Sequence, residues 1–291
     1  MADSNFNLKR NEILVRAYKR VGVLRPGTQI MSAAQLQDGI KILNLILREV
    51  DAKGTQNSKH LWALDERHLF MKAGGIIYGQ DDGLATNLQD LQSAFYRDTS
   101  GNETEIELLT SNNYESLVDK DQVGPPQKAY LKQDKDLQCQ LLYIWPSPSE
   151  ISDDVSEVVG SDGLNYRCVM PHTAAAETRP ISGRSWKIFW EPYGTAGTTW
   201  VDESEYTSGE NIRYMFKRPL YDFDNASDNP DFPPQWTRYL WLRTAYDLSG
   251  DYHILEEERR VIKTEYLEAE SDIFPSTKPE ETSHTNKHLF F

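Results

Sequence analysis

Several features that define common protein classes are missing from this 291-residue sequence. It has two cysteines, Cys139 and Cys168, without a CxxC spacing, so neither a disulfide framework nor a zinc site is predicted and both are expected as free thiols. No apolar run approaches the roughly 20 residues of a membrane-spanning helix. The first residues carry charges where a signal peptide would be apolar. We therefore expect a protein made in the cytosol, without a membrane anchor.

Catalytic signatures are also absent from the sequence. It has no G-x-S-x-G elbow, no Walker-type phosphate loop, no H-E-x-x-H helix and no glycine-rich nucleotide fingerprint. Adjacent carboxylates such as Asp81 and Asp82 arise by chance among 45 acidic residues and are typical of solvated turns. His172 lacks a second ligand at metal spacing, and the residues around His284 and His288 do not favour a helix. The sequence predicts no enzyme, no metal site and no cofactor.

The charge balance is acidic. The 45 acidic and 31 basic residues give a formal net charge of −14 at pH 7. Tight binding to a phosphate backbone depends on basic residues that release counterions, so this chain is a poor candidate for it. An acidic surface suits a wall along which duplex DNA slides, because like charges repel. The composition therefore favours a DNA conduit over a DNA-binding protein.

Apolar residues recur at helical spacing at both ends of the chain. One helix is predicted over Leu8–Val21 and a second from a Ser32 cap to Gly54. After Pro233 and Pro234 two further helices are predicted, with Gly250 between them. Each pair is predicted to form a helical hairpin, and each hairpin has an apolar stripe that it cannot bury by itself. The two pairs are therefore expected to pack together as one helical domain.

Between these helices the sequence turns to short segments rich in aromatic and β-branched residues, separated by turn residues. This pattern is typical of antiparallel strands. Strands are predicted over Leu69–Lys72, Ser93–Arg97, Glu105–Thr110, Gln127–Leu131 and Leu137–Trp145, with a short helix over Asn113–Val118.

The predicted fold class is α+β. A helical domain built from N- and C-terminal helical hairpins (residues 1–60 and 232–272) carries an inserted antiparallel β domain (61–147 and 212–231). This β domain carries a further small β module (148–211), and an extended, flexible C-terminal tail (273–291) follows. Because both hairpins and the flanking strands lie outside residues 150–210, the module is predicted to be dispensable for assembly into a larger complex, and its replacement by a short linker should leave a folded protein.

Four segments, in this order, resemble a known family. They are NEILVRAYKRVGVLRPGTQIMSAAQLQDGIKILNLILREVDAKG near the start, then LLTSNNYESLVDKDQVGPPQKAYL, the strand and turn LLYIWPSPS, and RPLYDFDNASDNPDFPPQWTRYLWLRTAYDLSGDYHI. Each segment alone carries little information, whereas the series is specific. In it the chain resembles the head-to-tail adaptor proteins of podoviruses, also called head-completion, tail tubular or tail accessory proteins.

The resemblance implies a structural protein of the bacteriophage virion, located at the head-tail junction and assembled in the bacterial host cytoplasm. It implies a homo-oligomeric ring, commonly twelvefold, that joins the portal protein to the tail nozzle or hub and to tail fibres. Double-stranded DNA would pass through this ring during ejection without specific binding. The residues themselves add one expectation, since aromatic side chains occupy more than one face of the helix after Pro234. Candidates for the subunit interface are Trp236, Tyr239, Trp241 and Tyr246.

The stretch 148–211 departs from the family pattern. It holds Trp186, Trp190 and Trp200, three of the seven tryptophans, together with Tyr166. Two interpretations stay open, because a small module needs large rings to make a core, whereas an exposed indole face stacks on a sugar ring. The second interpretation would make the protein a carbohydrate-binding or cell-wall-degrading tail component that contacts the host surface.

The C-terminal tail combines a polar composition with an apolar end. Residues 273–291 are too polar to form a core, yet the chain finishes on Leu289, Phe290 and Phe291. Such a segment is predicted to become ordered by filling a groove on a partner. We expect these three residues to dock on the portal or on a neighbouring subunit.

Overall fold

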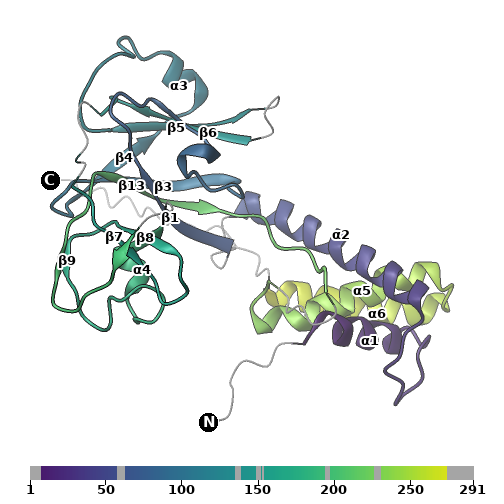
Figure 1. The fold of residues 1–291 in the computed structure, drawn as a ribbon. Helices are drawn as coiled ribbons and strands as arrows, with labels where there is room; N and C mark the ends of the chain where they lie inside the picture. Colours follow the sequence, from purple (N-terminus) through teal and green to yellow (C-terminus); the bar gives the residue numbers. More distant parts are fainter. Residues whose placement is uncertain are drawn as a thin grey trace, which may run out of the picture. The chain divides into compact units, whose positions relative to one another are not determined.

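The chain is an α+β protein, as predicted, and it divides into two compact units (Figure 1). The helical unit comprises Met1–Trp62 and Leu220–Phe291, and the β unit comprises Ala63–Pro219. The computed structural model describes residues 8–57, 63–134, 139–148, 152, 154–193, 197–225 and 231–273.

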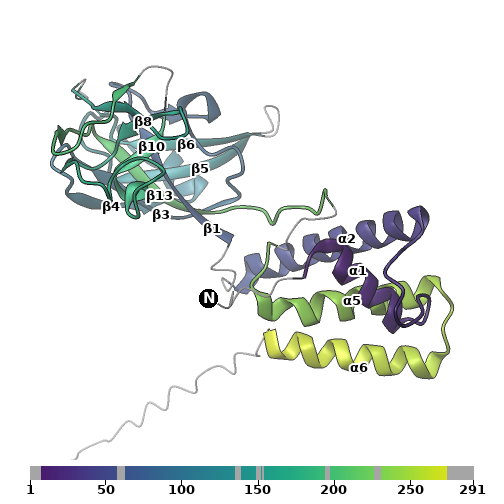
Figure 2. The same cartoon turned by 60° about the horizontal axis from the view of Figure 1, so that its bottom comes forward.

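Four helices make up the described part of the helical unit. They are α1 (Arg10–Arg20), α2 (Ala33–Asn57), α5 (Thr237–Asp251) and α6 (Glu256–Ile273), with a 3₁₀ turn, η3 (Pro234–Trp236), ahead of α5. Helix α5 packs against α1, α2 and α6. Helices α2 and α6 lie on opposite sides of α5 (Figure 2).

The predicted N-terminal signal of α2 is confirmed. The hydroxyl of Ser32 accepts a hydrogen bond from the Gln35 backbone N–H at 3.2 Å, and the Gln35 side chain accepts one from the Ser32 N–H at 2.9 Å. This reciprocal capping box satisfies two backbone donors of the first turn. Close to this cap, the Tyr18 hydroxyl of α1 donates to the Gln35 carbonyl at 2.7 Å, which ties α1 to α2.

The C-terminal helices differ from the prediction at their junction. Gly250 lies inside α5, which continues to Asp251. The Tyr252 N–H still donates to the Leu248 carbonyl at 3.1 Å, so the helical bonding runs past the glycine. The chain turns instead at His253, which adopts a positive φ of 49°. Gly250 as the separator of the two helices was wrong, because a glycine is tolerated in a helix whose other residues pack well.

The boundary between the two units also differs from the expected one. It lies after Pro219 rather than at residue 231, because Leu220, Phe223 and Phe232 are buried. The Phe223 N–H donates to the Asn44 side chain of α2 at 3.1 Å. The segment after the last long strand is therefore part of the helical unit.

A seven-stranded sheet forms the body of the β unit. The strand order is β1-β13-β3-β4-β5-β6-β2, and every neighbouring pair is antiparallel except β4 with β5. The strands are β1 (Leu64–Phe70), β2 (Ile77–Tyr78), β3 (Asp90–Arg97), β4 (Glu103–Leu108), β5 (Lys128–Asp134), β6 (Cys139–Trp145) and β13 (Asn211–Lys217). Buried residues of one face make the core, among them Leu69, Ala94, Ile106, Ile144, Ile212, Tyr214 and Phe216.

The predicted strands of the sheet are present, with shifted ends. The clearest shift is in β1, which begins at Leu64 rather than Leu69. Its charged residues 65–67 do not read as a strand, but β1 is at the edge of the sheet, where charged side chains are common. The short helix α3 (Ser111–Glu115) starts two residues earlier than predicted, since the Thr110 hydroxyl caps it. A 3₁₀ turn, η2 (Gln80–Asp82), follows β2.

Residues 154–209 form a small module within the β unit. It contains a four-stranded sheet of order β10-β8-β7-β11 and a two-stranded sheet of β12 and β9. Its elements are β7 (Glu157–Val159), β8 (Asn165–Cys168), β9 (His172–Thr173), α4 (Trp186–Phe189), β10 (Trp190–Pro192), β11 (Thr198–Thr199) and β12 (Glu205–Tyr206).

A row of residues across the large sheet anchors this module. Phe70, Asn211 and Arg97 are register partners on β1, β13 and β3, so their side chains share one face. The side chains of Asn211 and Arg97 donate to the Val169 carbonyl at 3.1 and 3.0 Å, and Phe70 meets the Tyr193 ring edge-on at 4.9 Å. Without the module, two buried donors of the sheet would lose their acceptor. This anchoring argues against the expectation that the module is dispensable.

Candidate functional sites

A cavity of about 430 Å³ lies between strand β1 and the module. This volume is within the range of about 300–1,000 Å³ found for small-molecule sites. Indole rings, carboxylates and basic side chains line it together. The lining residues are Asp65, Glu66, Arg67, His68, Trp186, Lys187, Trp190, Glu191 and Pro192.

Glu191 is the most constrained polar group of this cavity. Its side chain is largely buried, and its two oxygens have different partners. Arg67 Nη1 lies 3.0 Å from Oε1, and His68 Nδ1 lies 3.4 Å from Oε2. Nε2 of the buried His68 ring has no hydrogen-bond partner among the described residues. The carboxylate is thus fixed from two sides, while the imidazole keeps one nitrogen unused.

The four aromatic candidates of the module have different surroundings. Trp190 and Tyr166 are each 1% exposed and belong to the module core, where Trp190 Nε1 donates to the Thr178 carbonyl at 2.7 Å. Trp200 is half-buried against that core, and its Nε1 is buried without a partner in the described part of the chain. Trp186 is also half-buried, and it lines the cavity. Only Trp186 therefore combines an accessible ring with the cavity.

The four interface candidates on η3 and α5 differ in burial. Trp236 and Tyr239 are 3% and 1% exposed, and their rings meet edge-on at 5.9 Å inside the helical unit. These two residues belong to the core of the helical unit, where their rings are not exposed to a neighbouring subunit. Trp241 and Tyr246 are half-buried. The sequence pattern could not separate the buried from the half-buried residues, because α5 has three neighbouring helices that each cover a different face.

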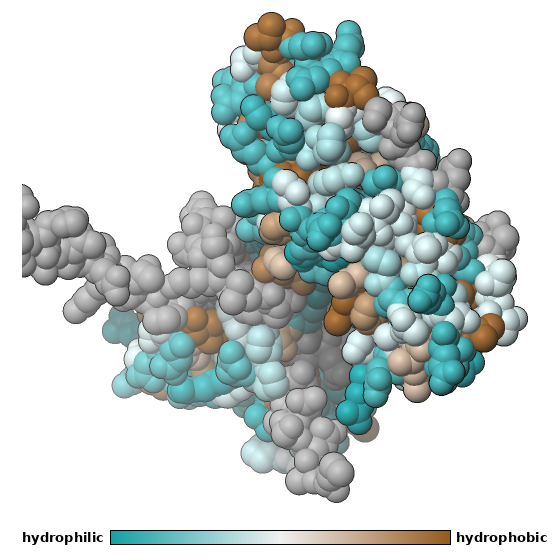
Figure 3. Space-filling view, turned by 90° about the vertical axis from the view of Figure 1, so that its left-hand side faces the viewer, coloured by the Kyte–Doolittle hydropathy of each residue, from teal (hydrophilic) through white to brown (hydrophobic). Residues whose placement is uncertain are grey.

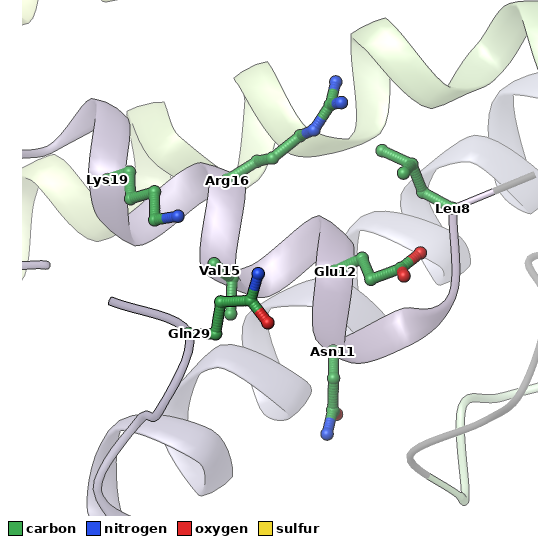
Figure 4. Close-up of a pocket in the computed structure, with 7 residues that line it drawn as sticks. All are labelled: Leu8, Asn11, Glu12, Val15, Arg16, Lys19 and Gln29. Atoms are coloured by element: carbon green, nitrogen blue, oxygen red, sulfur yellow. The ribbon is translucent and has the colours of Figure 1, made fainter. Parts of the chain in front are cut away.

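A second, more open groove of about 340 Å³ follows α1 in the helical unit (Figure 4). Its lining residues are Leu8, Asn11, Glu12, Val15, Arg16, Lys19 and Gln29. Glu12 already accepts a hydrogen bond from the Lys9 N–H at 2.9 Å, as part of the cap of α1. Arg16 and Lys19 extend from the same helix without converging on a common point (Figure 4). The groove is a solvated helix surface without a catalytic arrangement.

The half-buried His172 and the buried Cys168 lie close together in the module. His172 Nδ1 lies 2.9 Å from the Met170 carbonyl and 3.8 Å from Cys168 Sγ. Burial lowers the pKa of His172 and raises the pKa of the Cys168 thiol to about 12, so the thiol stays protonated and unreactive at neutral pH. Within the described ranges, no three His, Cys, Asp or Glu residues are placed to hold a metal ion.

The remaining sequence predictions fall in different places. Cys139 is a half-buried free thiol at the start of β6. Leu289, Phe290 and Phe291 lie outside the described residues, as do His284 and His288. None of the described helices is long and apolar enough to cross a membrane. On the side of the molecule shown in Figure 3, apolar side chains form small separate patches in a mainly hydrophilic surface.

No protein-family model matches the chain, and no curated protein matches it. The sequence did not predict that the polar residues of the cavity come together. Arg67 and His68 are more than a hundred positions from Glu191, and neither segment carries a recognisable motif. Only the tryptophan content of the module pointed to this region.

Proposed function

We propose that this chain is a structural subunit of a podovirus head-to-tail adaptor, a homo-oligomeric ring that joins the portal to the tail nozzle and lines the DNA conduit. In this proposal the two helical hairpins form the ring body, with the β unit inserted between them and directed to neighbouring or tail proteins. The main support is a pair of different exposed faces on opposite sides of the helical unit.

The first face belongs to α2. Leu45 is 64% exposed there, although it is a large aliphatic residue on a long helix. Lys41 and Arg48 are exposed four residues before and three residues after it, so the three side chains share one stripe. Leu45 therefore lies between two exposed basic side chains on α2. Glu49 is exposed four residues after it and Arg48 is paired with Asp222, so Lys41 is the basic group of this face without an ion pair among the described residues.

The second face belongs to α6. Val261 is 49% and Leu267 is 43% exposed. Glu257 and Glu268 are exposed four residues before and seven residues after Val261, and α6 as a whole carries seven acidic and three basic residues. Val261 therefore lies in an acidic surrounding, whereas Leu267 has the exposed Lys263 four residues before it.

Two different complementary faces on one subunit are what a ring requires. A closed ring larger than a dimer uses head-to-tail contacts, in which one face of a subunit meets a different face of the next. Apolar residues would be buried at the centre of such a contact, while basic and acidic residues select the partner and its orientation. A twofold dimer would instead need one face that complements itself.

The net charge of −14 per chain supports the conduit part of the proposal, because a ring multiplies it and duplex DNA would be repelled from the wall. The C-terminal residues Leu289, Phe290 and Phe291 would attach the ring to the portal. Tight, salt-sensitive binding of the purified protein to duplex DNA would contradict this part.

Charge reversal tests the ring contact. Lys41→Glu and Glu257→Lys each introduce a repulsive charge, and neither residue belongs to an ion pair among the described side chains. We expect the full chain to form a large ring, alone or on purified portal, measured by light scattering after size exclusion. Each single variant should shift the distribution to the monomer, and the double variant should restore the ring.

Lys132→Glu is the matched control, since Lys132 is an exposed residue of the β unit. It should assemble like the unchanged chain. A chain that remains monomeric with the portal present would contradict the proposal. Equal assembly of all four variants would contradict the two assigned faces.

A further inference from the structure

We propose that the cavity between β1 and the module binds a neutral saccharide, with Trp186 as the ring on which the sugar stacks. This site is separate from the ring contacts of the helical unit. The inference rests on three properties of the cavity: an accessible indole, a pre-oriented set of polar groups, and a mixed charge.

Trp186 offers both kinds of contact that an indole can give a sugar. Its ring lines the cavity and is half-buried, and it meets the Tyr166 ring edge-on at 5.5 Å. An indole face packs well on the C–H groups of a pyranose. Its Nε1 makes no hydrogen bond to any described residue, so it remains available as a donor. The neighbouring Trp190 lacks this freedom, because its Nε1 is bonded to Thr178.

The polar groups are held before any ligand arrives. The Glu191 carboxylate is oriented by Arg67 and His68, and a rigid acceptor binds a hydroxyl without a large loss of side-chain entropy. Arg67 has further N–H groups beyond the one that meets Glu191. Vicinal hydroxyls are donors and acceptors at once, so a carboxylate beside a guanidinium is suited to them.

The charges of the lining distinguish a sugar from other small ligands. Asp65, Glu66 and Glu191 would repel a phosphate or a carboxylate, while Arg67 and Lys187 would repel a cation. A coordinated metal ion is not supported, since no group of three ligands exists among the described residues. Lys187 Nζ lies 5.8 Å from the Trp186 ring centroid on an exposed and flexible side chain, so it can move aside. The hydroxyl groups of a neutral sugar can donate hydrogen bonds to the carboxylates and accept hydrogen bonds from the basic side chains.

The test uses the full chain labelled with ¹⁵N and a panel of probes. The neutral probes are methyl glucoside, methyl galactoside, methyl mannoside, N-acetylglucosamine, maltose and chitobiose. Glucuronate and inorganic phosphate represent anions. Assigned indole N–H resonances report on each tryptophan. We expect at least one neutral probe to shift the Trp186 resonance in a saturable manner, while the Trp241 resonance of the helical unit stays in place.

Variants connect this binding to the proposed residues. Trp186→Ala should weaken the affinity for that probe at least about tenfold, whereas Trp186→Phe, which keeps an aromatic face, should weaken it less. Glu191→Gln should also weaken it, and Trp241→Ala, a half-buried tryptophan outside the site, should leave it unchanged. Thermal unfolding of each variant establishes that it is folded.

Three outcomes would overturn the inference. The first is a folded chain whose Trp186 resonance responds to no neutral probe. The second is a response restricted to glucuronate or phosphate, which would make this an anion site. The third is sugar binding that Trp186→Phe, Glu191→Gln and Trp186→Ala all leave unchanged, which would place the sugar elsewhere.

Discussion

Arg97 of β3 donates a buried hydrogen bond from Nη1 to the Val169 carbonyl of the module at 3.0 Å. The same guanidinium contacts Glu103 on β4, with Nη2 2.6 Å from Oε1. The Arg97 side chain therefore bonds to the module and, through its ion pair with Glu103, to the neighbouring strand of the sheet. This connection ties the module to the large sheet of the β unit.

Replacing Arg97 by methionine should destabilise the β unit. The change removes a charge-assisted hydrogen bond and leaves Glu103 with one partner fewer, which should cost about 2–3 kcal/mol. Urea unfolding followed by tryptophan fluorescence would measure the loss. Lys132→Met, at an exposed position of the same sheet, is the control and should change the free energy of unfolding by less than about 0.5 kcal/mol. Equal midpoints for both variants would contradict the role of Arg97.

Removing the module should damage the sheet and spare the helices. Replacing residues 154–209 by a short Gly/Ser linker takes away the acceptor of Arg97 and Asn211, both buried, at about 1–3 kcal/mol for each unsatisfied donor. Circular dichroism should show a helical transition close to that of the full chain and an earlier loss of the β signal. A deletion variant whose sheet melts at the temperature of the full chain would show that the module is dispensable.

Acid should weaken the β unit through Glu103. The Arg213 hydrogen bond is the largest influence on its pKa; burial opposes it, Arg97 adds to it, and together they hold the pKa at about 2, against an ordinary value of 4.5. Because the folded pKa is depressed, the stabilisation is complete above the ordinary value and is lost as the pH falls toward the folded value. The free energy of unfolding should therefore decrease between about pH 5 and pH 2.

Glu103→Gln isolates this contribution. At pH 7 the variant should be less stable than the unchanged protein, and the gap between them should narrow as the pH falls toward 2, measured by urea unfolding at several pH values. A constant gap at every pH would show that Glu103 does not contribute through its charge.

Replacing Trp236 of η3 and Trp241 of α5 should affect the stability of the helical unit to different extents. Trp236→Ala empties a core position and should cost about 3–5 kcal/mol. Trp241→Ala, at a half-buried position, should cost less than about 1 kcal/mol. The comparison is made by chemical unfolding at a concentration where the chain is monomeric. Similar losses at both positions would contradict the division into core and surface.

The helices could be predicted from the sequence because their signals are local. Ser32 caps α2 as predicted, and apolar periodicity located all four helices in the described part of the helical unit. The junction at Gly250 failed because a single glycine does not reveal how far packing extends a helix. Strand β1 was placed too late, since its charged residues are acceptable only because β1 is at the sheet edge.

Only part of the candidate site could be predicted from the sequence. The aromatic content marked the module, and a core and a sugar platform were both considered for its rings. Which ring serves which purpose depends on contacts made across the fold. Both rings border the cavity, but Trp190 is covered by His172 and Tyr206 and is 1% exposed, whereas Trp186 is half-buried. The partners Arg67 and Glu191 meet only because β1 and β10 come together in space.

Site-specific crosslinking between subunits tests the central claim most directly. Leu45→Cys on α2 and Val261→Cys on α6 place one thiol on each proposed face, in a chain where the half-buried Cys139 is replaced by serine. The double variant, treated with a short bismaleimide and resolved by denaturing electrophoresis, should give a ladder of multimers that ends at one closed size. Each single variant should give no crosslinked species, because the two faces differ. Dimers from a single-cysteine variant, or no ladder from the double variant, would contradict a head-to-tail ring built from these faces.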